Sequence, residues 1–346
     1  MRSSAMDVSV FIPVHNGEKY LAQAIESVLG QTHRELELVV IDDGSTDGSR
    51  AIMERYARAD RRVRVVTQEN RGVTAAGNRG LEEARGDWVA RLDADDLFFP
   101  EKIERQLAFV KRHPDLRIAG TRGWFINDRG RSLGLVGTEG PFTREEFLRR
   151  RQSGEPVYFI HSSTLMHREA MLAIGGYRTQ FVQAEDVDLW LRAAERGYLL
   201  LKLPEPLVLY RIHRESLTMA RNAEQKLCHR WVMACAQARR EGRPEPCFAM
   251  FRAAERQRSA GEKVCAFLLE AGERLYQRAA LHYAGGAYPS LAACLLASLA
   301  LNPGHVIPRF YDRKIAPMLA GGLPAKSAPV HAVLGGKEAC RYASGK

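Results

Sequence analysis

The chain has 346 residues, of which 45% are hydrophobic and 27% charged, and this composition is typical of a globular protein rather than a disordered one. Its formal net charge of +10 comes from the C-terminal third, because residues 220–346 hold 19 Lys and Arg but only 9 Asp and Glu. The sequence has no zinc-finger spacing and no helix-turn-helix signal, so we expect no nucleic acid partner. An anionic membrane surface or a polyanionic acceptor suits this charge better.

The N-terminus has no apolar signal-peptide core, so we expect a cytoplasmic protein. All six cysteines follow residue 220, and none belongs to a Cys-x-x-Cys pair. We therefore expect reduced thiols packed in helices, with a disulfide or zinc framework as the lesser alternative.

Strands and helices alternate over the first 115 residues. Apolar and β-branched runs predict strands at residues 8–14, 35–41, 63–66 and 87–92. Helical spacing predicts a helix with apolar positions from Leu21 to Leu29, which Asn16 can cap, and further helices at about 49–59 and 73–84. This alternation indicates an α/β fold with a parallel sheet, in which ligands bind beyond the carboxyl ends of the strands.

Acidic residues follow two of these strands. If the backbone stays extended after the fourth strand, Asp93 and Asp95 project to the same side and can share a hard cation such as Mg²⁺; a solvated acidic turn is the alternative. Asp43 follows the second strand and can hydrogen-bond a base or ribose, or simply begin a helical turn. No Gly-x-x-x-x-Gly-Lys or Gly-x-Gly-x-x-Gly sequence follows a strand, which argues against a P-loop or dinucleotide enzyme.

A second acidic pair, Glu185 and Asp186, falls at or just before the start of a predicted helix. The helix dipole favours anions at that position, so helix capping alone would explain both residues. An acceptor hydroxyl also needs a nearby base to remove its proton, and a carboxylate can serve.

Five blocks of sequence carry a family resemblance. They span residues 8–21, 27–32, 40–47 (Val-Ile-Asp-Asp-Gly-Ser-Thr-Asp), 72–80 and 90–96 (Ala-Arg-Leu-Asp-Ala-Asp-Asp). In this order they strongly resemble the family 2 glycosyltransferases. The resemblance implies the glycosyltransferase A fold and inverting transfer of a sugar from a nucleoside diphosphate donor. It covers residues 7–215, with a nucleotide-sugar half at 7–115 and an acceptor half at 116–215.

The resemblance also implies roles on the donor side. Pro13, Val14 and Asn16 would lie near the base, Asp43 would contact base or ribose, and Asn78 or Arg79 would close that pocket. Asp93 would approach the ribose or the donor sugar. Asp95 would bind Mg²⁺ or Mn²⁺, with Asp93 beside it. Two smaller alternatives remain. Asn78 suits a polar helix position, and Arg79 can pair with Glu82 or Glu83.

On the acceptor side, the block around residues 184–192 resembles the family's Glu-Asp motif, which implies that Asp186 acts as base beside Glu185. His161, in a predicted strand or strand end, would lie near the acceptor or diphosphate, or be a hydrogen-bonded structural residue. His213 would touch the diphosphate or metal, or be an exposed loop histidine.

After residue 220 nothing specific to the family is visible. We expect a basic helical region at 220–323, with a break around residues 242–246, and a flexible tail at 324–346. The apolar run 281–301 is interrupted by Gly and Pro, so a buried helical hairpin or an interfacial membrane helix fits better than a membrane span. Attachment to the inner face of the membrane would suit a lipid-linked acceptor.

The sequence therefore predicts a metal-dependent, non-processive, inverting glycosyltransferase. The donor would be a nucleoside diphosphate sugar, with UDP favoured as nucleotide, and the acceptor a hydroxyl of a glycan or lipid-linked molecule in cell-surface polysaccharide or glycolipid synthesis. Two alternatives are a nucleotidylyltransferase acting on a sugar phosphate and a non-catalytic nucleotide-sugar binding module.

Overall fold

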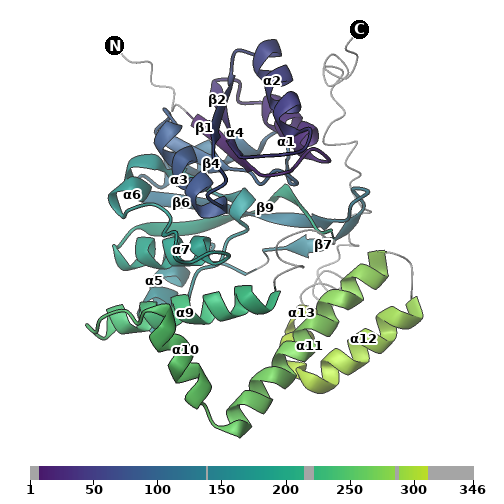
Figure 1. Ribbon diagram of the computed structural model, residues 1–346. Coiled ribbons are helices and arrows are strands. Elements are labelled where there is room, and N and C mark those ends of the chain that lie inside the picture. Colours follow the sequence, from purple (N-terminus) through teal and green to yellow (C-terminus); the bar gives the residue numbers. More distant parts are fainter. Residues whose placement is uncertain (1–7, 138, 214–221, 285–287, 311–346) are drawn as a thin grey trace.

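A nine-stranded mixed sheet forms the centre of the molecule (Figure 1). The computed structural model describes residues 8–137, 139–213, 222–284 and 288–310. The strand order is β3-β2-β1-β4-β8-β6-β9-β5, and β7 pairs with β6. The strands are β1 (Val8–Val14), β2 (Leu36–Asp43), β3 (Val63–Gln68), β4 (Trp88–Arg91), β5 (Leu97–Phe98), β6 (Leu116–Ile126), β7 (Ser132–Val136), β8 (Leu165–His167) and β9 (Leu199–Arg211).

Helices cover the sheet and extend beyond it. Those of the first 200 residues are α1 (Leu21–Leu29), α2 (Ser49–Ala59), α3 (Val73–Glu83), α4 (Lys102–Arg112), α5 (Arg144–Ser153), α6 (Arg168–Ala173) and α7 (Glu185–Glu195), with the short 3₁₀ helix η1 (His161–Ser163). The later ones are α9 (Asn222–Arg240), α10 (Phe248–Gln257), α11 (Ala260–Ala284), α12 (Tyr288–Leu301) and α13 (Pro303–Phe310).

The first four strands are all parallel, as the sequence predicts. β1 lies between β2 and β4, and β3 pairs with the outer side of β2. Their carboxyl ends therefore meet at one edge of the sheet, where such folds bind ligands. β8 then runs antiparallel between β4 and β6 and joins this half to the long β6 and β9 pair.

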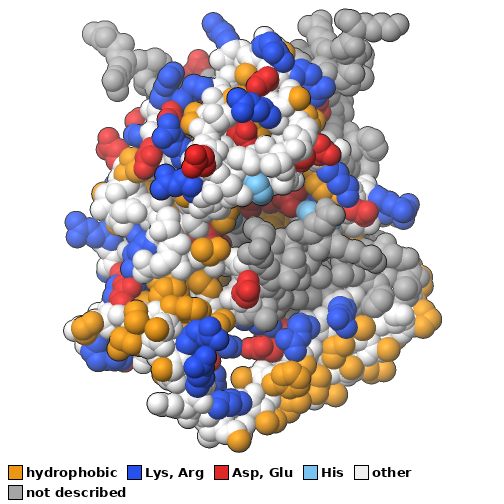
Figure 2. All heavy atoms as spheres, in the orientation of Figure 1, with side chains coloured by type: hydrophobic (Ala, Val, Ile, Leu, Met, Phe, Trp, Pro, Cys, Tyr) orange, Lys and Arg blue, Asp and Glu red, His pale blue; other side chains and the backbone are white. Residues whose placement is uncertain are grey.

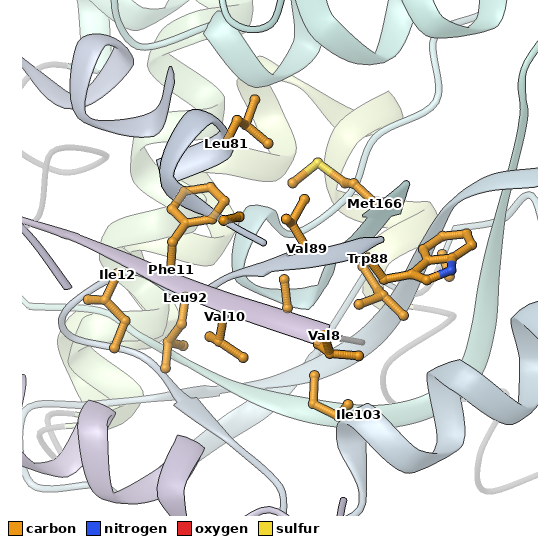
Figure 3. Packing of buried hydrophobic residues seen from close by; sticks show 14 of the residues in the cluster. Val8, Val10, Phe11, Ile12, Leu81, Trp88, Val89, Leu92, Ile103 and Met166 are labelled. Atoms are coloured by element: carbon orange, nitrogen blue, oxygen red, sulfur yellow. The ribbon is translucent and has the colours of Figure 1, made fainter. Parts of the chain in front are cut away.

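β1 is buried on both faces, which explains its continuous apolar sequence. Phe11 points to the side of Leu81 on α3, whereas Val10 and Ile12 point to the opposite side with Ile103 of α4 (Figure 3). Alternate side chains of the strand thus fill two separate layers of the core.

One expectation about the first helix is wrong. Asn16 does not cap α1, because Tyr20 precedes that helix and Asn16 adopts a left-handed conformation with φ of 55°. Its side-chain oxygen instead accepts a hydrogen bond from the backbone N–H of Thr46 at 2.8 Å. A loop of four residues therefore separates Asn16 from the helix and places it against the turn after β2.

Up to residue 310, the C-terminal helices agree with the predicted helical region and its break before α10, whereas the end of that region and the expected tail at 324–346 lie outside the described residues. α9 packs against α7 through a second hydrophobic cluster that includes Trp231, Val232, Phe181 and Leu191. α11 and α12 form the expected helical hairpin, but it is not buried: Phe267 is 62% exposed and Leu296 is 69% exposed. Within the described part of the chain, no helix combines the length and apolar character needed to cross a lipid bilayer.

Helix α3 lies so close to β1 that only glycine fits at position 80. A Cβ atom there would come within 2.3 Å of the Phe11 ring. We therefore expect Gly80→Ala to lower the free energy of unfolding by about 1–3 kcal/mol in urea denaturation, because the ring must move within a packed core. Gly261→Ala on α11 is the matched control, since a Cβ there has no neighbour within 4 Å. Equal stabilities of the two variants would contradict this explanation.

Candidate active site

Three loops meet at the carboxyl edge of the parallel strands. The His15 Nδ1–H donates to the carbonyl oxygen of Asp43 at 2.9 Å, and the Asn16 backbone N–H donates to the Ser45 hydroxyl at 3.1 Å. The loop after β1 is thus fixed against the loop after β2. Pro13 and Val14 end β1 beside Ile41 and Asp42 of β2. The residues that follow Val14 therefore lie at the edge of the sheet where we expect the nucleotide to bind.

Asp43 is buried, and it orders the loop before α3. Its carboxylate accepts hydrogen bonds from the backbone N–H groups of Arg71 and Gly72, both at 2.9 Å, and from the Gln68 side chain at 2.7 Å. Gly72 has φ of 86°, a conformation that favours glycine. Asp43 therefore holds the start of α3 in place, and it does not begin the helix α2, which follows Gly48.

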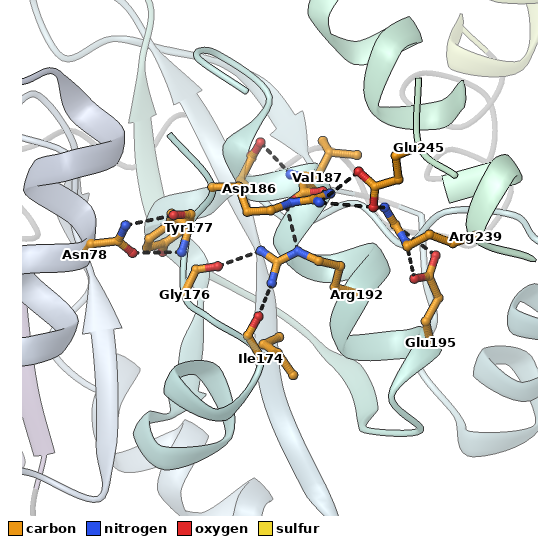
Figure 4. A network of polar contacts seen from close by, with 12 residues as sticks. Asn78, Ile174, Gly176, Tyr177, Asp186, Val187, Arg192, Glu195, Arg239 and Glu245 are labelled. Atoms are coloured by element: carbon orange, nitrogen blue, oxygen red, sulfur yellow. Dashed lines mark hydrogen bonds and ion pairs between the residues drawn. The ribbon is translucent and has the colours of Figure 1, made fainter. Parts of the chain in front are cut away.

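Asn78 and Arg79 on α3 already have protein partners. The Asn78 side chain accepts from the Tyr177 N–H at 2.8 Å and donates to the Tyr177 carbonyl at 2.7 Å (Figure 4). Arg79 forms an ion pair with Glu83 at 2.7 Å, one of the two alternatives expected from the sequence. Asn78 thus connects α3 to the segment that precedes α7.

The acidic residues after β4 lie in a turn. The strand ends at Arg91, and the Asp96 N–H donates to the Asp93 carbonyl at 3.0 Å. The expectation that an extended backbone makes Asp93 and Asp95 share one spot is therefore wrong. Asp93 accepts from the Arg91 Nε–H at 2.9 Å, whereas Asp95 Oδ2 lies 2.9 Å from Nε2 of His213.

Asp96, at the end of this turn, holds it in place through buried hydrogen bonds. It is buried and accepts hydrogen bonds from the Ser162 hydroxyl at 2.5 Å and from the Arg211 N–H at 2.8 Å. The Arg211 side chain also donates to the carbonyl oxygen of Asp95 at 2.8 Å. The end of β9 therefore holds the acidic turn, and it brings His213 alongside Asp95.

Arg91 is the centre of the site. It is only 3% exposed and lies between Asp93 and Glu185, whose Oε1 is 3.9 Å from its Nη1. Its guanidinium also donates to Nε2 of His161 at 3.4 Å and lies near the Tyr177 ring. Burial opposes the charge, but the Asp93 carboxylate and the other anionic neighbours raise the pKa of Arg91, so the buried cation persists.

His161 lies in the 3₁₀ helix η1 and not in the expected strand. It is buried, and its Nε2 accepts from the Tyr177 hydroxyl at 2.8 Å. Burial, with the nearby Arg91 charge, lowers the pKa of His161 well below its ordinary value. The ring is therefore neutral and hydrogen-bonded, with its proton on Nδ1 while Nε2 accepts.

Glu185 and Asp186 begin α7, as predicted. Burial, with the adjacent Asp186 carboxylate, raises the pKa of Glu185 to about 7, while Arg91 opposes this shift. Burial also raises the pKa of Asp186, although its carboxylate accepts a hydrogen bond from the Val187 N–H at 2.7 Å. Two acidic side chains with raised pKa values thus face one buried cation, an arrangement that is common at functional sites.

A network of arginines fixes the position of α7. The Arg192 side chain donates to the backbone oxygens of Ile174 and Gly176 (Figure 4). Its Nε also pairs with Asp188, which is fully buried and binds Arg178 as well. The start of α7 is therefore held against the same segment that Asn78 binds.

Asp95 and His213 form a candidate side-chain pair for a divalent cation. No cluster of three or more His, Cys, Asp or Glu side chains among the described residues has the arrangement of a metal site. Asp95 and His213 fit such an ion best, because a carboxylate and an imidazole face each other there and both are partly exposed. Both are ligand types for Mn²⁺, and the carboxylate also suits Mg²⁺, with substrate phosphates as further ligands.

The sequence analysis assigned no role to Arg91 or Tyr177. An arginine inside an apolar strand, two residues before an acidic turn, was the available signal for Arg91, because charged residues are rarely buried without partners. For Tyr177 the available signal was the Gly175-Gly176-Tyr177 run ahead of the acidic pair, although its partners lie far away in the sequence.

Comparisons with known proteins identify the family of this chain. The family model described as glycosyl transferase family 2 matches residues 9–175. TuaG of Bacillus subtilis (strain 168), which is named for teichuronic acid biosynthesis, is 43% identical over 229 residues, which are 61% of this chain and 81% of TuaG. EpsE of the same organism is 35% identical over 219 residues, or 62% of this chain and 75% of EpsE. The chain belongs to the family 2 glycosyltransferases.

Solved structures confirm the fold of this glycosyltransferase. Residues 1–349 of S. aureus TarS, in complex with UDP, align over 88% of this chain and 93% of that chain, with a TM-score of 0.51 and 16% identity. The mannosyltransferase PcManGT from Pyrobaculum calidifontis, in complex with GDP-Man and Mn²⁺, aligns over 85% and 86%, with a TM-score of 0.52 and 21% identity. The enzyme therefore has the glycosyltransferase A fold.

Arg91 lowers the pKa values of Glu185 and Asp186, so its removal should raise both. We expect the acid limb of the pH–activity profile of Arg91→Met to lie at higher pH than that of the wild type. At a fixed pH on that limb, transfer activity should fall about tenfold for each unit by which the pKa of the base rises. The pH profile of kcat at saturating donor measures this shift. Arg91→Lys retains a cation and should restore part of the profile. Identical acid limbs in Arg91→Met and the wild type would contradict the electrostatic role of Arg91.

Proposed function

We propose that this glycosyltransferase moves a sugar from a nucleoside diphosphate donor to an acceptor hydroxyl, with inversion at the anomeric carbon. The observation that carries the proposal is the buried Arg91, which joins the acidic turn after β4 to the start of α7. A donor-side carboxylate, Asp93, and an acceptor-side carboxylate, Asp186, thereby belong to one connected site.

The donor's base and ribose would lie on the loops after β1 and β2. Pro13, Val14 and Asn16 would line the base, with Asp43 holding the loop that leads to α3. Asn78 and Arg79 would act from α3, and Asp93 would approach the ribose or the donor sugar. We propose UDP as the nucleotide, with GDP as the competitor, since one fold relative binds each.

Asp186 would act as the base. The acceptor oxygen attacks the anomeric carbon as Asp186 takes its proton, and the bond from that carbon to the diphosphate breaks with the electron pair leaving on the phosphate. Attack opposite the leaving group inverts the centre without a covalent intermediate. Glu185, held by Arg91, would position Asp186, and His161 would lie near the acceptor or diphosphate.

Asp95 and His213 would hold a divalent cation, Mg²⁺ or Mn²⁺, with Asp93 nearby. When bound, such an ion stabilises the negative charge of the leaving diphosphate. The three carboxylates of the acidic turn support this role, since among the described residues the cations that contact the turn are Arg91 and Arg211. The name of TuaG supports an acceptor in cell-surface polysaccharide synthesis.

A donor screen tests this function. Purified enzyme is incubated with UDP-, GDP- and dTDP-sugars and Mn²⁺ or Mg²⁺, and release of the nucleotide is measured. We expect release from one nucleotide class, and loss of release with EDTA. Asp186→Asn should abolish transfer while the donor Kd changes less than about twofold, because the change removes the base but not the donor contacts.

Glu54→Gln is the matched control for Asp186→Asn, since Glu54 is a partly exposed carboxylate on α2 that forms an ion pair with Arg50. It should leave both transfer and donor binding unchanged. Loss of donor binding in Asp186→Asn, with transfer intact at saturating donor, would contradict the assignment of Asp186 as base.

We further propose that the α11 and α12 hairpin attaches the enzyme to an anionic membrane. Hydrophobic side chains gather over these helices, at the lower right of Figure 2. Val264, Phe267 and Leu296 are 57–69% exposed, and the C-terminal region that contains this hairpin, residues 220–346, carries the excess of Lys and Arg. Apolar and basic side chains together are typical of surfaces that lie in the headgroup region of acidic bilayers.

Vesicle flotation tests the attachment. We expect the wild type to float with vesicles containing phosphatidylglycerol at low salt, less at high salt, and not with phosphatidylcholine alone, because the attraction is electrostatic as well as apolar. Phe267→Glu combined with Leu296→Glu should abolish flotation. Leu148→Glu, a change at an exposed residue of α5, is the control. Absence of flotation by the wild type at low salt would refute the attachment.

A further inference from the structure

An exposed tyrosine and a histidine from the C-terminal region form a pair beside the proposed base. Tyr158 lies between α5 and η1 and is 40% exposed. Its hydroxyl is 3.0 Å from Nε2 of His229, on α9. The two rings are nearly parallel, with an interplanar angle of 25° and centroids 5.7 Å apart. This Tyr158–His229 platform thus joins the segment before η1 to a helix outside the region that the family model matches.

The platform lies on the acceptor side of the site. Three residues after Tyr158, His161 is buried against Arg91 and Tyr177. The helix that carries His229 packs against α7, whose first residues are Glu185 and Asp186. Phe159, the neighbour of Tyr158, packs edge-on against Trp190 of α7, with ring centroids 5.5 Å apart. Both members of the platform therefore lie next to the helix that carries the proposed base.

The immediate surroundings of Tyr158 are acidic. Burial raises the pKa of Tyr158 to about 12, and the charges of Glu139, Asp186 and Glu155 add to the shift. Burial, with the charge of Arg230, lowers the pKa of His229, which therefore stays neutral. The carboxylates near Tyr158 therefore disfavour an anion on the tyrosine side of the platform, whereas the positive charge of Arg230 acts on the histidine side.

We propose that Tyr158 and His229 bind the acceptor, and that the acceptor unit on this platform is an uncharged sugar ring. The C–H face of a pyranose is apolar and packs against an aromatic ring, while its hydroxyl groups can reach polar neighbours. The tyrosine supplies the ring, and its bond to His229 fixes the orientation of that ring. A hydroxyl of the stacked sugar then lies toward Asp186. This inference rests on the proposed function, because it assigns the partner of the same base.

Helix α9 would take part in acceptor binding, because its contacts position His229. Trp231, two residues after His229, is buried, and its indole N–H donates to the carbonyl oxygen of Pro246 at 2.7 Å. That contact and the cluster with α7 fix the register of α9, so that His229 faces Tyr158. The C-terminal helical region would then set acceptor specificity as well as carry the apolar hairpin.

Direct binding of simple sugars tests this inference. The probes are methyl glycosides of glucose, galactose, mannose and N-acetylglucosamine, with the methyl glycoside of glucuronic acid as the anionic probe. Each is added to the full chain with UDP and Mn²⁺, and saturation-transfer NMR reports contact with the ring C–H protons. We expect contact with at least one neutral glycoside, and a Kd about tenfold weaker for the glucuronide.

Four variants locate the contact. Tyr158→Ala should weaken binding of the neutral glycoside about tenfold, whereas Tyr158→Phe keeps the ring and most of the affinity. His229→Ala should lie between them, because the ring of Tyr158 loses its orienting partner. Tyr288→Ala is the matched control, since Tyr288 is a 64% exposed tyrosine on α12. Circular dichroism melting confirms that each variant is folded, and His229→Ala carries the test if Tyr158→Ala does not fold.

The outcomes separate this inference from the proposed function. No binding of any neutral glycoside, equal binding of the glucuronide, or a folded Tyr158→Ala with unchanged affinity would each overturn the platform. Release of nucleotide from donors is measured in parallel. If no donor releases nucleotide but the neutral glycoside still binds through Tyr158, the proposed function fails while the platform stands.

Discussion

The buried guanidinium of Arg91 is the interaction on which this site depends. Taking such a charge out of water costs several kcal/mol unless anions compensate for it. Asp93 and Glu185 provide that compensation from two parts of the chain that are 92 residues apart in sequence number. The ion pairs of Arg91 with these two carboxylates therefore hold the end of β4 against the start of α7.

Further polar contacts extend this constraint in both directions. Asn78 binds the backbone of Tyr177, and Arg192 donates to the carbonyl oxygens of Ile174 and Gly176. Helices α3 and α7 therefore bind the same short segment. Tyr177 in turn donates to His161. Helices α3 and α7 and the segment around His161 thus share one hydrogen-bonded network, in which a shift of any of them would leave buried polar groups without partners.

The C-terminal helices belong to this arrangement, although they lie beyond the region that the family model matches. α9 packs its apolar side against α7 and directs His229 toward Tyr158. α11 and α12 instead expose much of their apolar surface. Two neighbouring parts of one region therefore differ in their environment, and this difference agrees with separate roles in acceptor binding and in attachment to a surface.

The sequence alone determined the four parallel β units, the helices of the C-terminal region and the acidic start of α7, because local periodicity and capping signals specify such elements. It also identified the family from five ordered blocks. It misjudged the conformation of Asp93 and Asp95, since the strand ends at Arg91 and a turn directs the two carboxylates to different partners. Only the tertiary structure decided the pairings of Asp95 with His213, Arg91 with Glu185 and Tyr158 with His229, because each joins residues distant in sequence whose meeting depends on how strands and helices pack.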